Sequence, residues 1–267
     1  MIASVAMLVV GGGIVGVLSG VLGVGGAVII VPLLHTYFTW EGIGGTMVQQ
    51  LALGTSLATI LFTTFSSFWG HLRYGSMRMD LLKCMTPGIV VGTFGGALLA
   101  PHLSQGFLRI FFSCFMFYMG IRILRVDRKI EGRELSLRIL AVASLVIGLI
   151  SSLAGVAGTM LCVTVLAGAA VEWKEAVGTS AGLSLPICAT GAIGYIVSGW
   201  GRPDLPPFSL GFIYVPGMVE LLVSSVLMAY LGAKISHCAW LPVRKLRTAF
   251  ALGVMGLACY QLGQILL

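Results

Sequence analysis

The chain has 267 residues, of which 58% are hydrophobic and 9% are charged, and its mean hydropathy is +1.03. A water-soluble domain carries about 25% charged residues, so this composition excludes a soluble globular protein and indicates an integral membrane protein. Apolar runs of about 20 residues are typical of membrane helices, whereas the strands of a barrel would alternate, so we expect an all-α fold.

The net charge of +7 does not predict nucleic-acid binding, because the basic residues sit in short loops beside apolar runs, as in an orientation signal for membrane insertion. The six cysteines show neither a C-x-x-C motif nor metal-ligand spacing, so we expect free thiols, no metal and no cofactor. The N-terminus lacks a basic region and a clear cleavage site, and it is predicted to be a retained membrane segment.

Apolar segments follow one another along the chain, and we predict them at 2–38, 48–69, 81–101, 106–124, 137–170, 175–199, 208–233 and 246–267. Segment 2–38 would be about 55 Å long as one helix, whereas the hydrocarbon core is about 30 Å thick. Segment 137–170 has the same excess length. Both carry a glycine cluster near the middle, where glycine allows the chain to break or reverse.

The two halves of the chain repeat in the same order. The matched stretches are 22–34 with 154–166, 54–58 with 178–182, 87–92 loosely with 216–221, 96–103 weakly with 232–239, and 108–120 with 246–258. We therefore predict a first transmembrane repeat over 1–124, a cytoplasmic linker over 125–136 and a second transmembrane repeat over 137–267.

Three basic clusters, at 71–83, 122–138 and 234–247, decide the topology. Basic loops are cytoplasmic, and all three fall on one side only if segments 2–38 and 137–170 each begin and end on the same side. The predicted fold is therefore two inverted repeats, each a broken or hairpin helix followed by three transmembrane helices. Both termini are then outside.

Two motifs occur in both halves and carry a resemblance to a known family. The first half has Gly23, Gly25, Gly26 and Pro32, and then Ala52, Gly54, Thr55 and Ser56. The second half repeats the pattern, with Ala157 in place of Gly25 and Thr164 in place of Pro32. This doubled set resembles the TauE/SafE family, also called the toluene sulfonate uptake permease family.

The resemblance implies a secondary transporter for a small sulfur-containing anion, such as sulfite or an organosulfonate like sulfoacetate. It further implies export by alternating access and a place in the bacterial inner membrane. The implied partners are the anion and the lipid bilayer, and no nucleic acid. The sequence leaves open which anion is carried, the direction, the coupling ion and whether the chain forms a homodimer.

The glycine clusters and the Gly-Thr-Ser motifs are our candidate substrate site. A helix broken within the membrane exposes N–H groups and the positive end of its dipole, which bind anions, and hydroxyls add further donors. Such broken helices form the sites of many transporters. The candidates are Gly23, Gly25, Gly26, Gly54, Thr55, Ser56, Gly155, Gly158, Thr159, Gly178, Thr179 and Ser180. Helix packing is the alternative, because small residues also line helix contacts in membranes.

Glu220 lies near the centre of the predicted segment 208–233. An ionisable group at such a depth costs free energy and marks a functional site by default, so Glu220 is a candidate proton carrier. The alternatives are a structural hydrogen-bonding partner or a position nearer the helix end.

Two other functions compete with the transporter. A passive anion channel would use the same residues. An intramembrane hydrolase could use Ser180, because 178–182 fits G-x-S-x-G. That motif needs a strand before the serine, which the sequence does not predict, and the apolar segments place no histidine centrally as a base, so we expect no enzyme.

Overall fold

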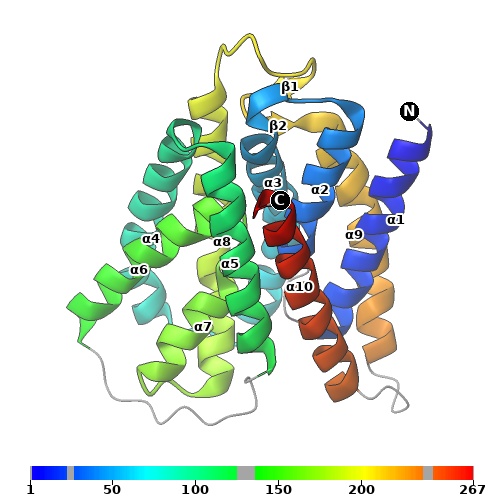
Figure 1. The fold of residues 1–267 in the computed structure, drawn as a ribbon. Coiled ribbons are helices and arrows are strands. Elements are labelled where there is room, and N and C mark those ends of the chain that lie inside the picture. Colours follow the sequence, from blue (N-terminus) through cyan, green and yellow to red (C-terminus); the bar gives the residue numbers. More distant parts are fainter. Residues whose placement is uncertain (1, 23–26, 125–135, 237–242, 267) are drawn as a thin grey trace.

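The computed structural model describes residues 2–22, 27–124, 136–236 and 243–266, and these form ten α-helices and one short β-hairpin (Figure 1). The elements are α1 Ile2–Leu22, α2 Ala27–Glu41, α3 Val48–Arg73, α4 Met79–Leu99, α5 Gln105–Leu124, α6 Leu137–Ala154, α7 Thr159–Gly168, α8 Trp173–Gly199, β1 Ser209–Leu210, β2 Ile213–Tyr214, α9 Val215–Ser236 and α10 Val243–Leu266. Short 3-10 helices at Gly45–Met47 and Ala100–His102 extend α3 and α4. The expected all-α fold is confirmed.

Four helical stretches of the described chain are long and apolar enough to cross a membrane: Gly45–Arg73, Met79–His102, Gln105–Leu124 and Trp173–Gly199. Shorter apolar stretches lie at Met7–Leu18, Arg138–Ala154, Thr159–Gly168 and Val215–Met228. The chain is therefore a multi-pass integral membrane protein.

The two overlong apolar segments are each divided into two helices. In the second half, Gly155 ends α6 and Gly158 precedes α7, both with a φ of +64°, a backbone conformation that side chains with a Cβ rarely adopt. This break confirms the predicted role of those glycines. In the first half α1 ends at Leu22 and α2 begins at Ala27, so Gly23, Gly25 and Gly26 lie outside the described residues.

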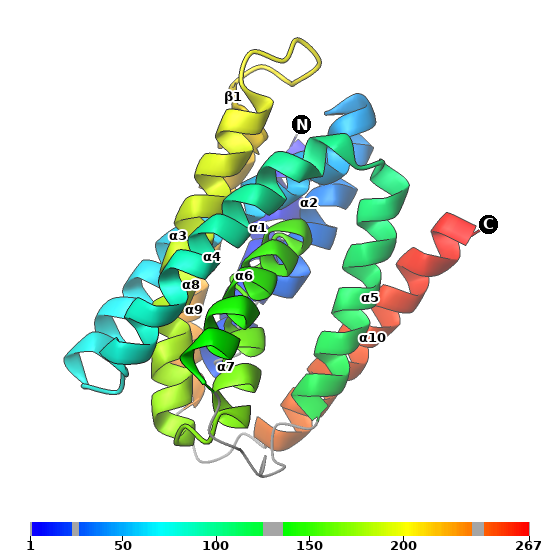
Figure 2. The same ribbon diagram turned by 90° about the vertical axis from the view of Figure 1, so that its left-hand side faces the viewer.

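The helices run in alternating directions between an upper and a lower side of the bundle (Figures 1 and 2). The N-terminus, the C-terminus and the β1–β2 hairpin lie on the upper side. The ends of α3 and α5 and the start of α10, which border the three basic loops, lie on the lower side. This is the arrangement predicted from the charges. Helix α1 runs downward and α6 upward, and each is followed by a helix that returns toward its own starting side.

Contacts between the two halves come in exchanged pairs. Helix α1 packs on α9, and its counterpart α6 packs on α4. In the same way, α8 packs on α4, and its counterpart α3 packs on α9. Two further contacts join counterparts directly, α3 with α8 and α5 with α10. Figure 2 shows α5 and α10 side by side. The helices of each half are therefore paired with helices of the other half.

Two close glycine contacts show which residues of the two halves are equivalent. A Cβ on Gly12 of α1 would overlap the hydroxyl of Ser224 in α9, and a Cβ on Gly88 of α4 would overlap the hydroxyl of Ser144 in α6. Extending the match of 22–34 with 154–166 makes Gly12 equivalent to Ser144, and extending the match of 96–103 with 232–239 makes Gly88 equivalent to Ser224. The two pairs are thus the same contact with glycine and serine exchanged.

This register replaces the loose match of 87–92 with 216–221. Pro87 lies well inside α4, whereas Pro216 is the second residue of α9, where a proline fits because the first N–H groups of a helix have no intrahelical partner. The shared Pro-Gly pair therefore sits at different depths in the two helices.

The segment predicted to be apolar and helical from residue 208 begins instead with a hairpin. Strand β1 pairs antiparallel with β2, and α9 starts only at Val215. Phe208 has a φ of +65° and Gly211 a φ of +57°, so the chain turns back here. A Cβ on Gly211 would overlap the carbonyl oxygen of Ile196 in α8, which shows how closely the hairpin packs on the bundle.

Cysteine labelling tests the predicted sides. In a variant without native cysteines, Tyr74→Cys and Ser136→Cys should react with an impermeant maleimide only in inverted vesicles, because both positions are exposed and border basic loops. Asp204→Cys, which is exposed beside the hairpin, should react in right-side-out vesicles. Labelling of positions 74 and 136 from opposite sides would contradict the topology.

Candidate functional site

The first Gly-Thr-Ser motif joins α3 to the start of α9. Gly54 packs so closely on the carbonyl oxygen of Phe212 that a Cβ would overlap it. The next residue, Thr55, accepts a hydrogen bond from the backbone N–H of Tyr214 at 3.0 Å. Phe212, Thr55 and Ser56 are fully buried. Here the glycine provides the close approach, and the threonine oxygen pairs with an N–H that precedes α9.

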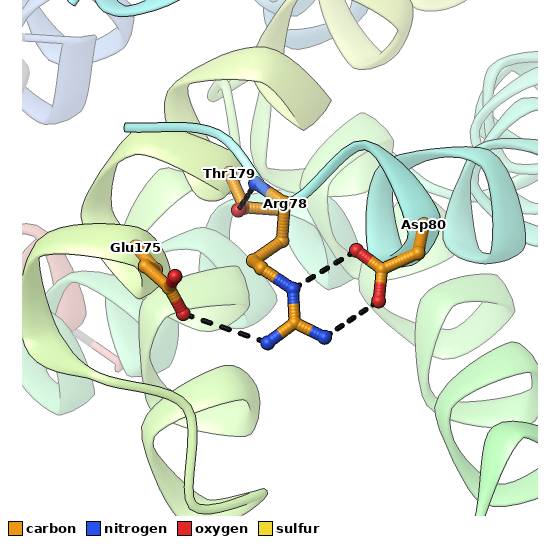
Figure 3. Close-up of polar contacts among 4 residues, drawn as sticks. All are labelled: Arg78, Asp80, Glu175 and Thr179. Atoms are coloured by element: carbon orange, nitrogen blue, oxygen red, sulfur yellow. Dashed lines mark hydrogen bonds and ion pairs between the residues drawn. The ribbon is translucent and has the colours of Figure 1, made fainter. Parts of the chain in front are cut away.

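The second motif makes the same joint between α8 and the start of α4. A Cβ on Gly178 would overlap the carbonyl oxygen of Ser76, and Thr179 accepts a hydrogen bond from the backbone N–H of Arg78 at 2.9 Å (Figure 3). In the register set by the Gly-Ser contacts, Ser76 and Arg78 are equivalent to Phe212 and Tyr214. Each half therefore holds the other through the same two interactions.

An ion-pair network is added at the second joint. Arg78 donates to both carboxylate oxygens of Asp80, at 3.0 and 2.6 Å, and lies 3.5 Å from a carboxylate oxygen of Glu175, one turn before Thr179 on α8 (Figure 3). The hydrogen bonds to Asp80 and its charge raise the pKa of the Arg78 guanidinium above its usual value. All three side chains are substantially exposed, so water screens their charges and the pairs contribute little stability.

The serines of the two motifs differ in their partners. Ser56 donates to the carbonyl oxygen of Gly155, at the break between α6 and α7, at 2.9 Å. Ser180 is also fully buried, yet its hydroxyl has no hydrogen-bond partner among the described residues. The first motif thus uses its hydroxyls to hold the fold, whereas the second retains an unpaired donor inside the protein.

Ser180 lies one helical turn before Ser184, the residue of α8 that contacts the start of α7. Thr159 begins this helix, and its hydroxyl is 2.7 Å from that of Ser184, which donates to the carbonyl oxygen of Ser180. The first hydrogen bond of the α7 ladder joins the Cys162 N–H to the Gly158 carbonyl oxygen at 3.0 Å. The N–H groups of residues 159–161 therefore lie ahead of the ladder, at the positive end of the helix.

Ser151, at the end of α6, is a second buried hydroxyl of this region. It is fully buried, has no hydrogen-bond partner among the described residues, and would be overlapped by a Cβ on Gly158. The end of α6, the start of α7 and the middle of α8 thus surround the break with neutral hydroxyls and N–H groups. Such a set of donors can hold an anion.

The structure places the remaining candidates apart from this region or leaves them undescribed. Gly23, Gly25 and Gly26 lie outside the described residues. Glu220 lies in the second turn of α9 and not at its centre, because the helix starts later than predicted. Its Oε2 is buried and has no hydrogen-bond partner among the described residues, and Tyr37 and Tyr214 lie nearby.

Sequence reasoning missed Ser151 and Ser184. Ser184 lies one helical turn after Ser180, so the 3.6-residue period could have placed both on one face of α8. Ser151 precedes the glycine cluster by too short a distance to face α7 unless the chain reverses at Gly155. Its position therefore depends on the geometry of the break.

The fold and these buried helix ends define a multi-pass helical membrane protein with polar groups at a break inside the bundle, the architecture of a transporter. The family described as sulfite exporter TauE/SafE matches residues 8–260, and the chain belongs to it. The chain therefore functions as a membrane transporter and not as an enzyme.

Curated relatives agree with this assignment. A "Probable membrane transporter protein" of Haemophilus influenzae is 32% identical over 243 residues, 90% of this chain and 91% of the relative. A protein with the same description from Methanocaldococcus jannaschii is 26% identical, covering 94% and 93% of the two chains. One from Bacillus subtilis is 26% identical, covering 84% and 87%. No solved structure matches the chain.

Two substitutions separate the interactions that Arg78 makes. Thr179→Val removes the acceptor of a backbone N–H and should lower the free energy of unfolding by about 1–3 kcal/mol. Glu175→Gln removes only an exposed ion pair and should lower it by less than about 1 kcal/mol. Denaturant unfolding of the purified protein measures both. A larger loss for Glu175→Gln than for Thr179→Val would show that the ion pair holds the joint.

Proposed function

We propose that the protein is a secondary transporter for a small sulfur-containing anion, such as sulfite or an organosulfonate, and that it exports this anion across the bacterial inner membrane. The observation that supports this most directly is the start of α7, where N–H groups and the unpaired hydroxyl of Ser151 face the break. The description of the matched family as sulfite exporters supports the substrate class and the direction.

The site that we propose is centred on Gly155, Gly158, Thr159 and Ser180, the part of the candidate set that lies at the α6–α7 break. Gly54, Thr55, Gly178 and Thr179 contribute to it by holding the two halves together, and Ser56 by fixing the Gly155 carbonyl. Neutral hydrogen bonds contribute about 0.5–1.5 kcal/mol each, which suits a carrier that must release its cargo.

We further propose that the halves over 1–124 and 137–267 are inverted repeats and that transport proceeds by alternating access. The exchanged helix contacts and the opposite directions of α1 and α6 support this arrangement. In transporters of this construction, one repeat moves against the other around a fixed midplane site. The paired joints at Gly54 and Gly178 lie between the halves, where such a movement would act.

Counterflow in proteoliposomes tests the function. Vesicles loaded with unlabelled sulfite should accumulate labelled sulfite, because a carrier exchanges its substrate, whereas a passive channel would only equilibrate it. Ser180→Ala should lower the apparent affinity by about tenfold or less, since one neutral donor is lost. Ser198→Ala is the matched control, because that hydroxyl only donates to the Tyr195 carbonyl of its own helix.

The absence of counterflow, with saturation-free and electrogenic flux in its place, would favour the channel. Taurine, sulfoacetate and thiosulfate in the same assay would show which anion is preferred. An unchanged affinity in Ser180→Ala would move the site away from α7.

Glu220 is the proposed proton carrier. Its buried Oε2 gives it a place to hold a proton without a competing partner among the described residues. Glu220→Gln should abolish the pH dependence of transport and leave the folded protein intact. Glu175→Gln, a change of the same type at an exposed position, should keep the wild-type pH profile. An unaltered profile in Glu220→Gln would exclude the role.

A further inference from the structure

The hydroxyls at the α6–α7 break differ from those at the equivalent positions of the first half. In the register of the repeat, Thr159 is equivalent to Ala27 and Ser184 to Ile60, which carry no hydroxyl. Ser180 is equivalent to Ser56, whose hydroxyl is already bonded to Gly155. Ser151 is equivalent to Ser19, so the first half lacks two of the four hydroxyls and has a third engaged in holding the fold.

Two of the second-half hydroxyls call for an acceptor. Ser151 and Ser180 are fully buried and neither has a hydrogen-bond partner among the described residues. A buried donor without an acceptor is unfavourable, and an oxygen of an anion at the start of α7 would accept a hydrogen bond from Ser151. Ser151 lies against Gly158, the residue that caps α7, so its hydroxyl is directed to the helix end.

The region supplies little positive charge. The end of a helix is equivalent to about half an elementary charge, and every other donor named above is neutral. Helix α7 itself carries no charged residue, and the charged residues of the helices packed on it are Arg138 at the start of α6 and Lys174 and Glu175 at the start of α8. Arg138 lies 13 residues before Ser151, whereas Lys174 and Glu175 lie six and five residues before Ser180 and carry opposite charges.

Contacts place two cations near this region: Arg78, whose guanidinium is paired with Asp80 and Glu175, and Arg122 of α5. The Arg122 guanidinium donates to the hydroxyl of Thr164, which lies about 7.5 Å along α7 from Thr159 by the helical rise. It therefore contacts the side of α7 and not its first turn. Cys162 in α7 is fully buried, and burial keeps a thiol neutral.

We infer that the site at the start of α7, completed by Ser151 and Ser184, selects singly charged tetrahedral oxyanions of the R–SO₃⁻ or hydrogen sulfite type over dianions. The helix end balances about half of one negative charge, and hydroxyl donors solvate the rest, whereas a second charge would be buried without a counter-charge in contact with it. This inference rests on the proposed function, and it names the charge state of the substrate.

A panel of three anions on the wild-type protein tests this charge selection. Methanesulfonate is a monoanion and sulfate a dianion throughout the neutral pH range, while sulfite passes from hydrogen sulfite to the dianion within that range. Methanesulfonate should bind with a pH-independent Kd, sulfate should bind at least about tenfold more weakly, and the apparent Kd of sulfite should rise with the dianion fraction. Calorimetry on purified protein measures all three.

The outcomes separate the inference from the function on which it rests. Sulfate binding as tightly as methanesulfonate, or tighter sulfite binding as the dianion forms, would overturn the charge selection and leave the transporter proposal standing. Failure of all three anions to bind would overturn both.

Ser151→Ala locates the selection. This change removes a donor that has no partner among the described residues, so it should weaken methanesulfonate binding about tenfold and leave thermal stability unchanged. Ser144→Ala is the control on the same helix, because that buried hydroxyl donates to the Ala141 carbonyl of its own turn. Equal affinities in wild-type and Ser151→Ala protein would place the anion elsewhere.

Discussion

The two halves are joined by close contacts of two glycines with two backbone carbonyl oxygens. Gly54 meets the Phe212 oxygen and Gly178 meets the Ser76 oxygen, and in each case the following threonine accepts the N–H of the residue just before α9 or α4. A Cβ at either glycine would push the loop away and break the threonine hydrogen bond. The position of α4 and α9, and of the helices α6 and α1 that pack on them, therefore depends on these joints.

The two joints differ in their surroundings. At the first joint the ring of Tyr214 packs edge-on against the fully buried Phe38 of α2, at 5.6 Å between centroids, so separation would expose apolar surface. At the second joint the Arg78 side chain is 44% exposed and its ion pairs are solvated. If the halves separate at this joint, water hydrates the charged side chains in place of their ion-pair partners, so the free-energy cost is small. The same backbone joint is thus firm on the upper side and weaker on the lower side.

The sequence was sufficient to predict the class and the division of the two overlong segments, because these depend on length and glycine content. A segment of about 55 Å cannot cross a core of about 30 Å without breaking, and Gly155 and Gly158 adopt the positive φ that a reversal requires. The start of α9 and the roles of Thr55 and Thr179 could not be predicted in this way. They depend on the β1–β2 hairpin and on N–H groups from the opposite half, which no local pattern shows.

The Gly-Thr-Ser motif has different roles in the two halves although its letters are the same. A threonine oxygen that accepts an N–H and a serine that donates to a carbonyl both strengthen a contact inside the membrane, where water cannot replace a lost partner. In the first half both hydroxyls are used in this way. In the second half the Ser180 hydroxyl has no partner among the described residues, whereas its equivalent Ser56 donates to the Gly155 carbonyl at the break. The threonine of the motif therefore joins the two halves in both copies. The serine is bonded in the first copy and lacks a hydrogen-bond partner among the described residues in the second.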